Sequence, residues 1–291
     1  MNTSKGGAGD GRGPLSRRLV WKAWLWLGAV GMAALVVGPL LWGIMTSFKT
    51  EVTAVSYPPT LWPRPFVWRN YASVFTHRTF LAELANSVLY SVGGVSLALL
   101  VGGPAGYAAS RFAFAGKRAL LLFILGTSMI PGVALLVPTF YLLDRIGMVN
   151  SALAISVIFA ARLAPQTVWF MQNFVDGVPV DIEEAALVDG ATRRQVLLRI
   201  LAPLIRPGLA ATFILGMITI WNDYITVAAF APDAARRTLQ VAIVHTVFDT
   251  QGMSWSFMMA FAVVTSMPVI LVFLAAQKWF VSGLTAGSLK G

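Results

Sequence analysis

The chain has 291 residues, of which 57% are hydrophobic and only 12% are charged. A soluble globular protein carries about 25% charged residues, so this composition excludes the soluble globular class. It predicts a membrane protein whose helices form a single domain. Cysteine is absent, which excludes disulfides and a cysteine nucleophile. The formal net charge of +10 fits lysine and arginine held on the cytoplasmic side of a membrane better than nucleic-acid binding.

Residues 1–18 are rich in glycine and serine, and we predict a disordered cytoplasmic tail followed by a transmembrane domain over residues 19–291. The basic flank that precedes residues 23–48 resembles that of a signal peptide. The uncharged run itself is longer than a signal-peptide core, however. It is therefore expected to be an uncleaved first span.

Six charge-poor intervals are long enough for spans of about 20 residues. They lie within residues 23–48, 84–110, 119–143, 146–175, 207–232 and 250–277. With the N-terminus inside, 14 lysines and arginines fall in cytoplasmic segments and 7 in external ones. The positive-inside rule therefore places both termini and residues 179–207 in the cytoplasm.

The long external segment, residues 49–83, contains several prolines and tryptophans. Prolines stiffen a segment, and tryptophans favour the membrane interface. The segment is either a lid over the helices or a docking surface for an external partner. In the second span, glycines at 93, 94, 102, 103 and 106 are expected to allow close helix packing.

Arg162 is expected about 15 Å into the fourth span, where a charge is costly and must face protein or water. It either lines a translocation path or anchors the helix by bonding backbone carbonyls. Asp223, in the cluster Trp221-Asn222-Asp223-Tyr224, is expected about 24 Å into the fifth span. It contacts substrate or a neighbouring helix, or it is an interfacial residue in water. The different depths argue against an Arg162–Asp223 pair.

Residues 179–207 form a charged stretch in this otherwise apolar chain. Asp181 and Glu184 have capping-box spacing and predict a helix that starts near Ile182, and Gly190 is placed to end it. Thr192 and Gln195 repeat that spacing and predict a second helix, which Pro203 interrupts. The pattern fits an amphipathic connector at the membrane surface, or a helix that docks into another protein through a face formed by Ile182, Ala185 and Ala186.

The same stretch closely resembles the EAA loop of permease subunits in binding-protein-dependent ABC importers. That loop has Glu-Ala-Ala, three residues, Gly, nine residues, then Ile-x-Leu-Pro. The corresponding residues here begin at Glu184, Gly190 and Ile200, and the one departure is Ala202, where the pattern prefers Leu. The external segment around Asn70, the end of the second span and residues 277–291 are similar to maltose-type and glycerol-phosphate-type sugar permeases.

The resemblance implies an all-α membrane protein with the type I ABC importer permease fold, six transmembrane helices and a cytoplasmic coupling helix. It implies two ATP-binding partner subunits, a second permease subunit, an extracytoplasmic solute-binding protein and a carbohydrate substrate, in a bacterial cytoplasmic membrane. The residues implied in coupling to the ATPase are Glu184, Ala185, Ala186, Asp189 and Gly190. The candidates for the translocation path are Arg162, Trp221, Asn222 and Asp223.

No nucleotide-binding, metalloprotease or nucleophile-elbow motif appears in the sequence. We therefore expect a protein that is not an enzyme, holds no metal or cofactor, and depends on partner subunits to bind ATP. An ion-coupled secondary transporter is the alternative; it predicts intramembrane acids and often an inverted repeat. Asp223 is the acid available within the predicted spans, and we detect no repeat.

Overall fold

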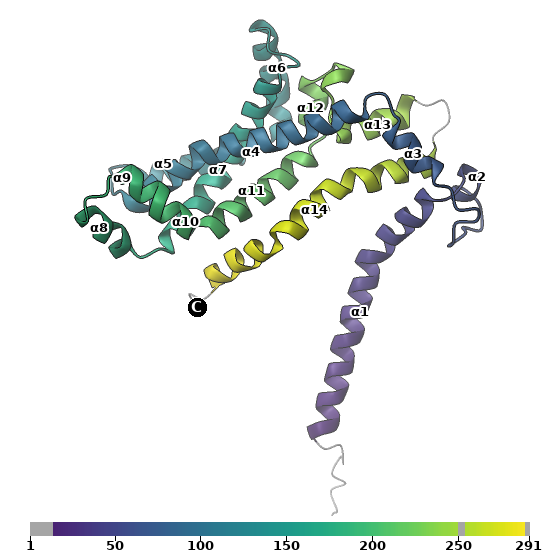
Figure 1. The fold of residues 1–291 in the computed structure, drawn as a ribbon, viewed down its shortest axis with the longest axis horizontal. Coiled ribbons are helices and arrows are strands. Elements are labelled where there is room, and N and C mark those ends of the chain that lie inside the picture. The colour runs from purple at the N-terminus through teal and green to yellow at the C-terminus, as the bar shows by residue number, and fades with distance from the viewer. Residues whose placement is uncertain (1–13, 250–253, 289–291) are drawn as a thin grey trace, which may run out of the picture.

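The computed structural model describes residues 14–249 and 254–288, in which helices are joined by loops and no strand occurs (Figure 1). The longer helices are α1 (Pro14–Ser47), α4 (Phe80–Arg111), α5 (Lys117–Thr127), α6 (Leu136–Arg145), α7 (Ala152–Asp176), α11 (Arg206–Trp221), α13 (Leu239–Asp249) and α14 (Trp255–Ser288). The shorter ones are α2 (Glu51–Ala54), α3 (Arg69–Phe75), η1 (Gly132–Leu135), α8 (Val180–Val188), α9 (Arg193–Gln195), the π-helical η2 (Val196–Leu201), α10 (Ala202–Leu204), α12 (Ile225–Phe230) and η3 (Ala234–Arg236).

Helix α1 begins at Pro14, inside the predicted N-terminal tail, and the rest of that tail lies outside the described residues. Within the residues that the structure describes, four helices are long and apolar enough to cross a membrane. They are Trp21–Ser47 of α1, α4, α7 and Trp255–Gln277 of α14. Two bent pairs bring the number to six if each pair counts as one span. The pairs are Lys117–Thr127 with Gly132–Arg145, and Arg193–Leu204 with Arg206–Trp221.

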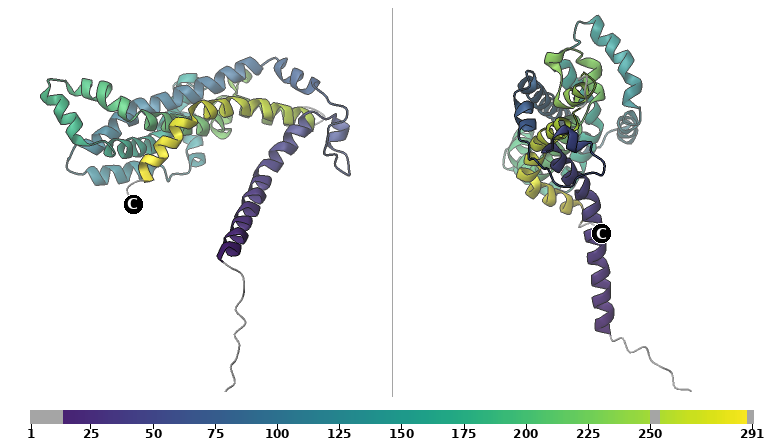
Figure 2. Two further views of the ribbon diagram at one scale, coloured as in Figure 1. Left: turned by 60° about the horizontal axis from the view of Figure 1, so that its bottom comes forward. Right: turned by 90° about the vertical axis from the view of Figure 1, so that its right-hand side faces the viewer.

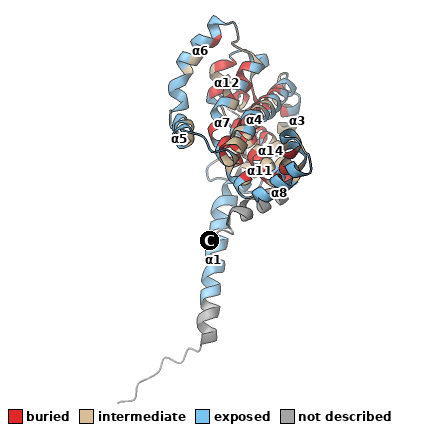
Figure 3. Ribbon diagram, turned by 90° about the vertical axis from the view of Figure 1, so that its left-hand side faces the viewer, coloured by how far each residue is buried: buried red, intermediate tan, exposed pale blue. Residues whose placement is uncertain are grey.

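The third predicted span is not one continuous helix. Its halves, α5 and η1–α6, meet at an angle of 84°. The break falls at Pro131, which cannot donate a backbone hydrogen bond and which disfavours helical geometry at the residue before it. Figure 3 shows α5 and α6 standing apart from the helices that carry most of the buried residues, and both are largely exposed.

The core of the molecule lies where α4 packs along α7, with α11 and α14 beside them (Figure 1). The predicted role of the glycines in α4 is confirmed at three positions. A Cβ on Gly94, Gly102 or Gly106 would come within 2.8 Å of atoms of α7. Gly103 differs, because nothing lies within 4 Å of the place where its Cβ would be.

Helix α1 leaves this core at a steep angle, as Figures 1 and 2 show. Its most apolar window has no buried residue. Near its C-terminal end it approaches α14, where a Cβ on Gly43 would lie 3.6 Å from the sulfur of Met259. The bulk of this apolar helix is therefore left uncovered by residues 14–249 and 254–288.

The external segment is folded against the outer end of α1. The Asn70 amide donates to the carbonyl oxygens of Ser47 at 2.8 Å and Lys49 at 3.0 Å, and the hydroxyls of Tyr71 and Ser47 are 2.7 Å apart. The Lys49 side chain is buried, with Nζ donating to the Thr60 carbonyl. These bonds order the segment and leave large side chains such as Tyr57 and Trp62 on its outer surface.

Candidate functional site

The glycine turn after α8 has the predicted geometry. Gly190 has φ +89°, in the left-handed region that side chains rarely adopt. The Gly190 amide bonds the Leu187 carbonyl at 3.1 Å, and the Ala191 amide bonds the Ala186 carbonyl at 3.0 Å. This pair of bonds is a Schellman motif, which satisfies the last carbonyls of the helix and turns the chain sharply towards α9.

The start of α8 differs from the prediction. The helix begins at Val180, directly after Pro179, and no side chain caps it. Asp181 lies inside the first turn and so cannot form the expected capping box with Glu184. Proline presets the backbone dihedral at the helix entry. Acidic groups in the first turn also stabilise the positive end of the helix.

The second helix of the pair begins as predicted. The Thr192 hydroxyl accepts from the Gln195 amide at 3.3 Å, and the Gln195 side chain accepts from the Thr192 amide at 2.7 Å, completing a capping box. The helical chain passes through Pro203 and bends by 75° at Ile205 instead. Pro203 lies where the π-helical η2 passes directly into α10, and a π-helical stretch is one of the usual irregularities of a helix that contains an interruption in its hydrogen bonds.

Helix α8 exposes the predicted coupling residues. Glu184, Ala185, Asp189 and Gly190 are exposed, and Ala186 is half-buried. Apolar side chains lie exposed beside them: Val180, Ile182, Leu187 and Val188. An exposed apolar surface on so short a polar-flanked helix is typical of an interface with another protein.

The buried side chain of α8 is Glu183, which the sequence analysis did not single out. Its carboxylate accepts from Arg111 Nε at 2.6 Å and from the Tyr107 hydroxyl at 2.9 Å. Arg111 also donates through Nη2 to the carbonyls of Val175 at 3.0 Å and Val178 at 2.8 Å. The sequence offered one signal for this role, a second acidic residue directly before the Glu-Ala-Ala run. Hydrophobic periodicity could not show that this residue is buried, because a helix of nine residues is too short to reveal which face is covered.

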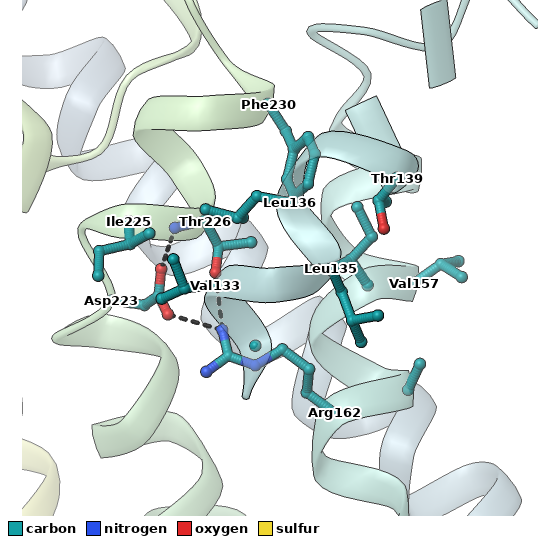
Figure 4. Close-up of a pocket in the computed structure, with 13 residues that line it drawn as sticks. Val133, Leu135, Leu136, Thr139, Val157, Arg162, Asp223, Ile225, Thr226 and Phe230 are labelled. Carbon is teal, nitrogen blue, oxygen red and sulfur yellow. Dashed lines mark hydrogen bonds and ion pairs between the residues drawn. The ribbon is translucent and has the colours of Figure 1, made fainter. Parts of the chain in front are cut away.

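A cavity of about 380 Å³ lies between α6, α7 and the turn that leads into α12 (Figure 4). Its walls are mainly apolar, with Leu136, Val157 and Phe230 among them. Arg162, Asp223, Thr226 and Thr139 supply its polar groups. A mainly apolar cavity with a few convergent polar groups is the usual form of a small-molecule site.

Arg162 and Asp223 form an ion pair in this cavity, contrary to the prediction. Arg162 Nη1 lies 2.8 Å from Asp223 Oδ2 and donates to the Thr226 hydroxyl at 2.7 Å. Asp223 Oδ1 in turn accepts from the Thr226 amide at 2.8 Å. The depth argument failed because it counted along two helices from separate assumed starts, whereas α11 ends at Trp221 and the chain then turns towards α7.

The other two predicted path residues do not line the cavity. Trp221 is buried, and its indole nitrogen donates to the Thr265 carbonyl of α14 at 3.2 Å. Asn222 donates to the Ile218 carbonyl of its own helix at 2.8 Å. The structure thus brings Arg162 and Asp223 together and uses Trp221 to fix the end of α11 against α14.

Comparisons with known proteins agree with this architecture. The trehalose/maltose transport system permease protein MalG of Thermococcus litoralis is 32% identical over 91% of this chain and 95% of its own length. The galactooligosaccharides transport system permease protein GanQ of Bacillus subtilis is 31% identical over 89% of this chain and 92% of its own length.

Among solved structures, a bacterial ABC transporter involved in alginate import aligns with a TM-score of 0.77 at 24% identity, over 92% of this chain and 99% of that one. This likeness confirms the predicted all-α fold of a type I ABC importer permease. Residues 102–286 match the family described as "Binding-protein-dependent transport system inner membrane component". The chain therefore belongs to the family of inner membrane components of binding-protein-dependent transport systems.

Proposed function

We propose that this chain is a membrane-spanning subunit of an ATP-driven importer that carries a carbohydrate into the cell. The observation that carries the proposal is the form of α8, a short helix that ends in the Gly190 turn and presents an exposed apolar and acidic surface, while one buried side chain, Glu183, holds it to α4. The substrate class rests on relatives whose names specify trehalose and maltose, galactooligosaccharides and diacetylchitobiose.

In this proposal α8 docks on an ATP-binding subunit. Glu184, Ala185, Ala186, Asp189 and Gly190 form the contact, and the neighbouring Ile182, Leu187 and Val188 lose their exposed apolar surface on docking. ATP is bound by the partner subunits, and this chain holds no cofactor. The rigid Gly190 turn passes movement of α8 to α9 without bending.

The cavity at Arg162 and Asp223 is our candidate for the translocation path. The Arg162 side chain is 47% exposed, whereas that of Asp223 is 12% exposed. The guanidinium therefore presents free N–H groups to the cavity while its charge is balanced by the carboxylate. Such a neutral, hydrogen-bonding pair, in a cavity that the Phe230 ring also lines, suits a polyhydroxylated ligand.

The remaining partners are a second permease subunit, which we expect to differ from this chain, and an external solute-binding protein. Helix α1 supports the first, because it extends away from the core with its apolar surface uncovered. The exposed aromatic side chains of the external segment support the second. In this arrangement both termini and α8 face the cytoplasm of a bacterial cell.

The test is purification of the chain from its native host in mild detergent, followed by mass spectrometry of the proteins that accompany it. We expect an ATPase and a second permease, and uptake into liposomes that requires ATP and a binding protein. Candidate sugars are then screened by isothermal titration against that binding protein. Uptake that instead follows an ion gradient, by the chain alone, would support a secondary transporter and contradict this proposal.

A further inference from the structure

Glu183 is unusual because a carboxylate on a short surface helix is expected to face water. Its side chain is only 7% exposed, and that of Arg111 is 10% exposed. Both oxygens are engaged, one by Arg111 and the other by Tyr107, at 2.6 and 2.9 Å. Both partners belong to the cytoplasmic end of α4, so α8 is tied to a helix far from it in sequence.

Arg111 joins three segments at one point. Its Nε binds Glu183 of α8, and its Nη2 binds one carbonyl at the end of α7 and one in the connection to α8. The planar guanidinium can satisfy all these acceptors at once, which an ammonium group cannot do with the same geometry. Ser110 adds a hydrogen bond to Asp176 at the end of α7.

The two helices that meet at this junction, α4 and α7, pack closely against each other. A Cβ on Gly102 would lie 2.7 Å from the Thr167 side chain, and one on Gly106 would lie 2.6 Å from that of Met171. Such close approach leaves α4 and α7 little freedom to slide, because packed interiors resist small displacements. A force that reaches Arg111 therefore acts on both helices.

We propose that the Arg111–Glu183 ion pair transmits movement of α8 to the α4–α7 pair, which makes Arg111 and Glu183 positioning residues of the coupling helix. The inference rests on the proposed function, in which an ATPase moves α8. A buried ion pair adds little net stability compared with apolar side chains of similar size, but it fixes geometry and orientation. That property suits a junction that must carry a directed movement.

The test uses the importer assembled in liposomes with its ATP-binding subunits, and a cysteine introduced as Val157→Cys in the wall of the cavity. The natural chain has no cysteine, so an impermeant maleimide labels this chain at that position alone, and labelling is read on this chain after the subunits are separated by electrophoresis. In the parent we expect the labelling rate to change when ATP and vanadate are added. In Glu183→Gln and Arg111→Gln we expect ATP hydrolysis to continue and the labelling rate to lose its response to ATP.

Two further variants separate transmission from folding. Arg111→Met combined with Glu183→Leu leaves no unpaired buried charge, and we expect it to fold and retain its ATPase subunits but to remain unresponsive. Lys117→Gln removes a nearby positive charge outside the junction, and we expect it to respond like the parent. A normal ATP response in the folded double variant would overturn the proposed role of the ion pair.

The proposed function itself has a separate readout. Val188→Asp places a charge on the most exposed apolar position of α8, on a different side of the helix from Glu183, and we expect it to lose the ATPase subunits. If Val188→Asp retains those subunits, or if labelling in the parent does not respond to ATP, the docking role of α8 is wrong and the ion-pair proposal is wrong with it. If the parent responds and Val188→Asp loses its ATPase subunits, the ATP response of the ion-pair variants alone decides the inference.

Discussion

Two glycines of α4 that are three residues apart, Gly103 and Gly106, differ sharply in what surrounds them. At Gly106 a Cβ would lie 2.8 Å or less from the Met171 side chain and the backbone of α7, whereas at Gly103 it would meet nothing within 4 Å. We expect Gly106→Ala to destabilise the detergent-solubilised chain by about 1–3 kcal/mol through overpacking. Gly103→Ala should stabilise it by up to about 1 kcal/mol, because alanine favours a helix more than glycine does. Thermal unfolding measures both, and equal shifts in the two variants would contradict this account of the packing.

Gly190 is needed for its backbone conformation and not for lack of space around it. Its φ of +89° disfavours any β-branched side chain, although a Cβ there would have open space. We expect Gly190→Val to strain the turn by about 1–2 kcal/mol. This change should lower uptake per ATP hydrolysed while the protein stays in the membrane. Asparagine tolerates the left-handed region, so Gly190→Asn should behave almost like the parent. Normal uptake and ATPase activity in Gly190→Val would exclude a coupling role for the turn.

At the scale of elements, α2 and α14 are held together by one carboxylate. Glu51 accepts from the amides of Trp255 at 2.9 Å and Ser256 at 3.2 Å, and from the hydroxyls of Ser254 and Ser256 at 2.9 and 2.8 Å. It thereby satisfies amides that the first turn of α14 leaves free. Burial raises the pKa of the Glu51 carboxyl, but these hydrogen bonds outweigh it and hold the pKa below the ordinary 4.5.

A depressed pKa in the folded state links this cap to pH. Its contribution to stability is present above the unfolded-state pKa of about 4.5 and is lost as the pH falls through the lower folded-state value. We expect Glu51→Gln to lower the melting temperature at neutral pH and to reduce the loss of stability on acidification. Asp144→Asn, which removes an exposed carboxylate, is the control. A pH profile unchanged by Glu51→Gln would show that the cap contributes nothing.

The elements also show where sequence-based prediction succeeds. The Gly190 turn and the Thr192–Gln195 cap follow from local chemistry, so both could be predicted. The Arg162–Asp223 pair could not, because it depends on where α11 ends relative to α7 in space. The burial of Glu183 likewise depends on the position of Arg111, 72 residues earlier in the chain. Tertiary packing sets both contacts, so the local sequence around Arg162, Asp223 or Glu183 has no pattern that predicts them.

At the scale of the whole molecule, the helical bundle has two distinct ends. The α8–α9 pair and the loop between α4 and α5 lie at one end of the bundle, and α2 and α3 lie at the other (Figure 1). In the predicted topology, the segments on the side of the first end, together with the two termini, hold 14 lysines and arginines against 7 on the other side, so the positive-inside rule places this side in the cytoplasm. This asymmetry is what gives α8 access to an intracellular ATPase in our proposal.

Absence of cysteine makes that orientation directly measurable. Tyr57 and Asp233 are exposed at the end proposed to be external, and Ala115 and Val188 are exposed at the end proposed to be cytoplasmic. Each is replaced singly by cysteine, and spheroplasts are treated with an impermeant maleimide. We expect Tyr57→Cys and Asp233→Cys to react in intact spheroplasts, because no membrane separates them from the reagent. Ala115→Cys and Val188→Cys should react only after the membrane is disrupted, and the parent chain should never react. The reverse pattern would place α8 outside the cell, where no ATP-binding subunit could reach it.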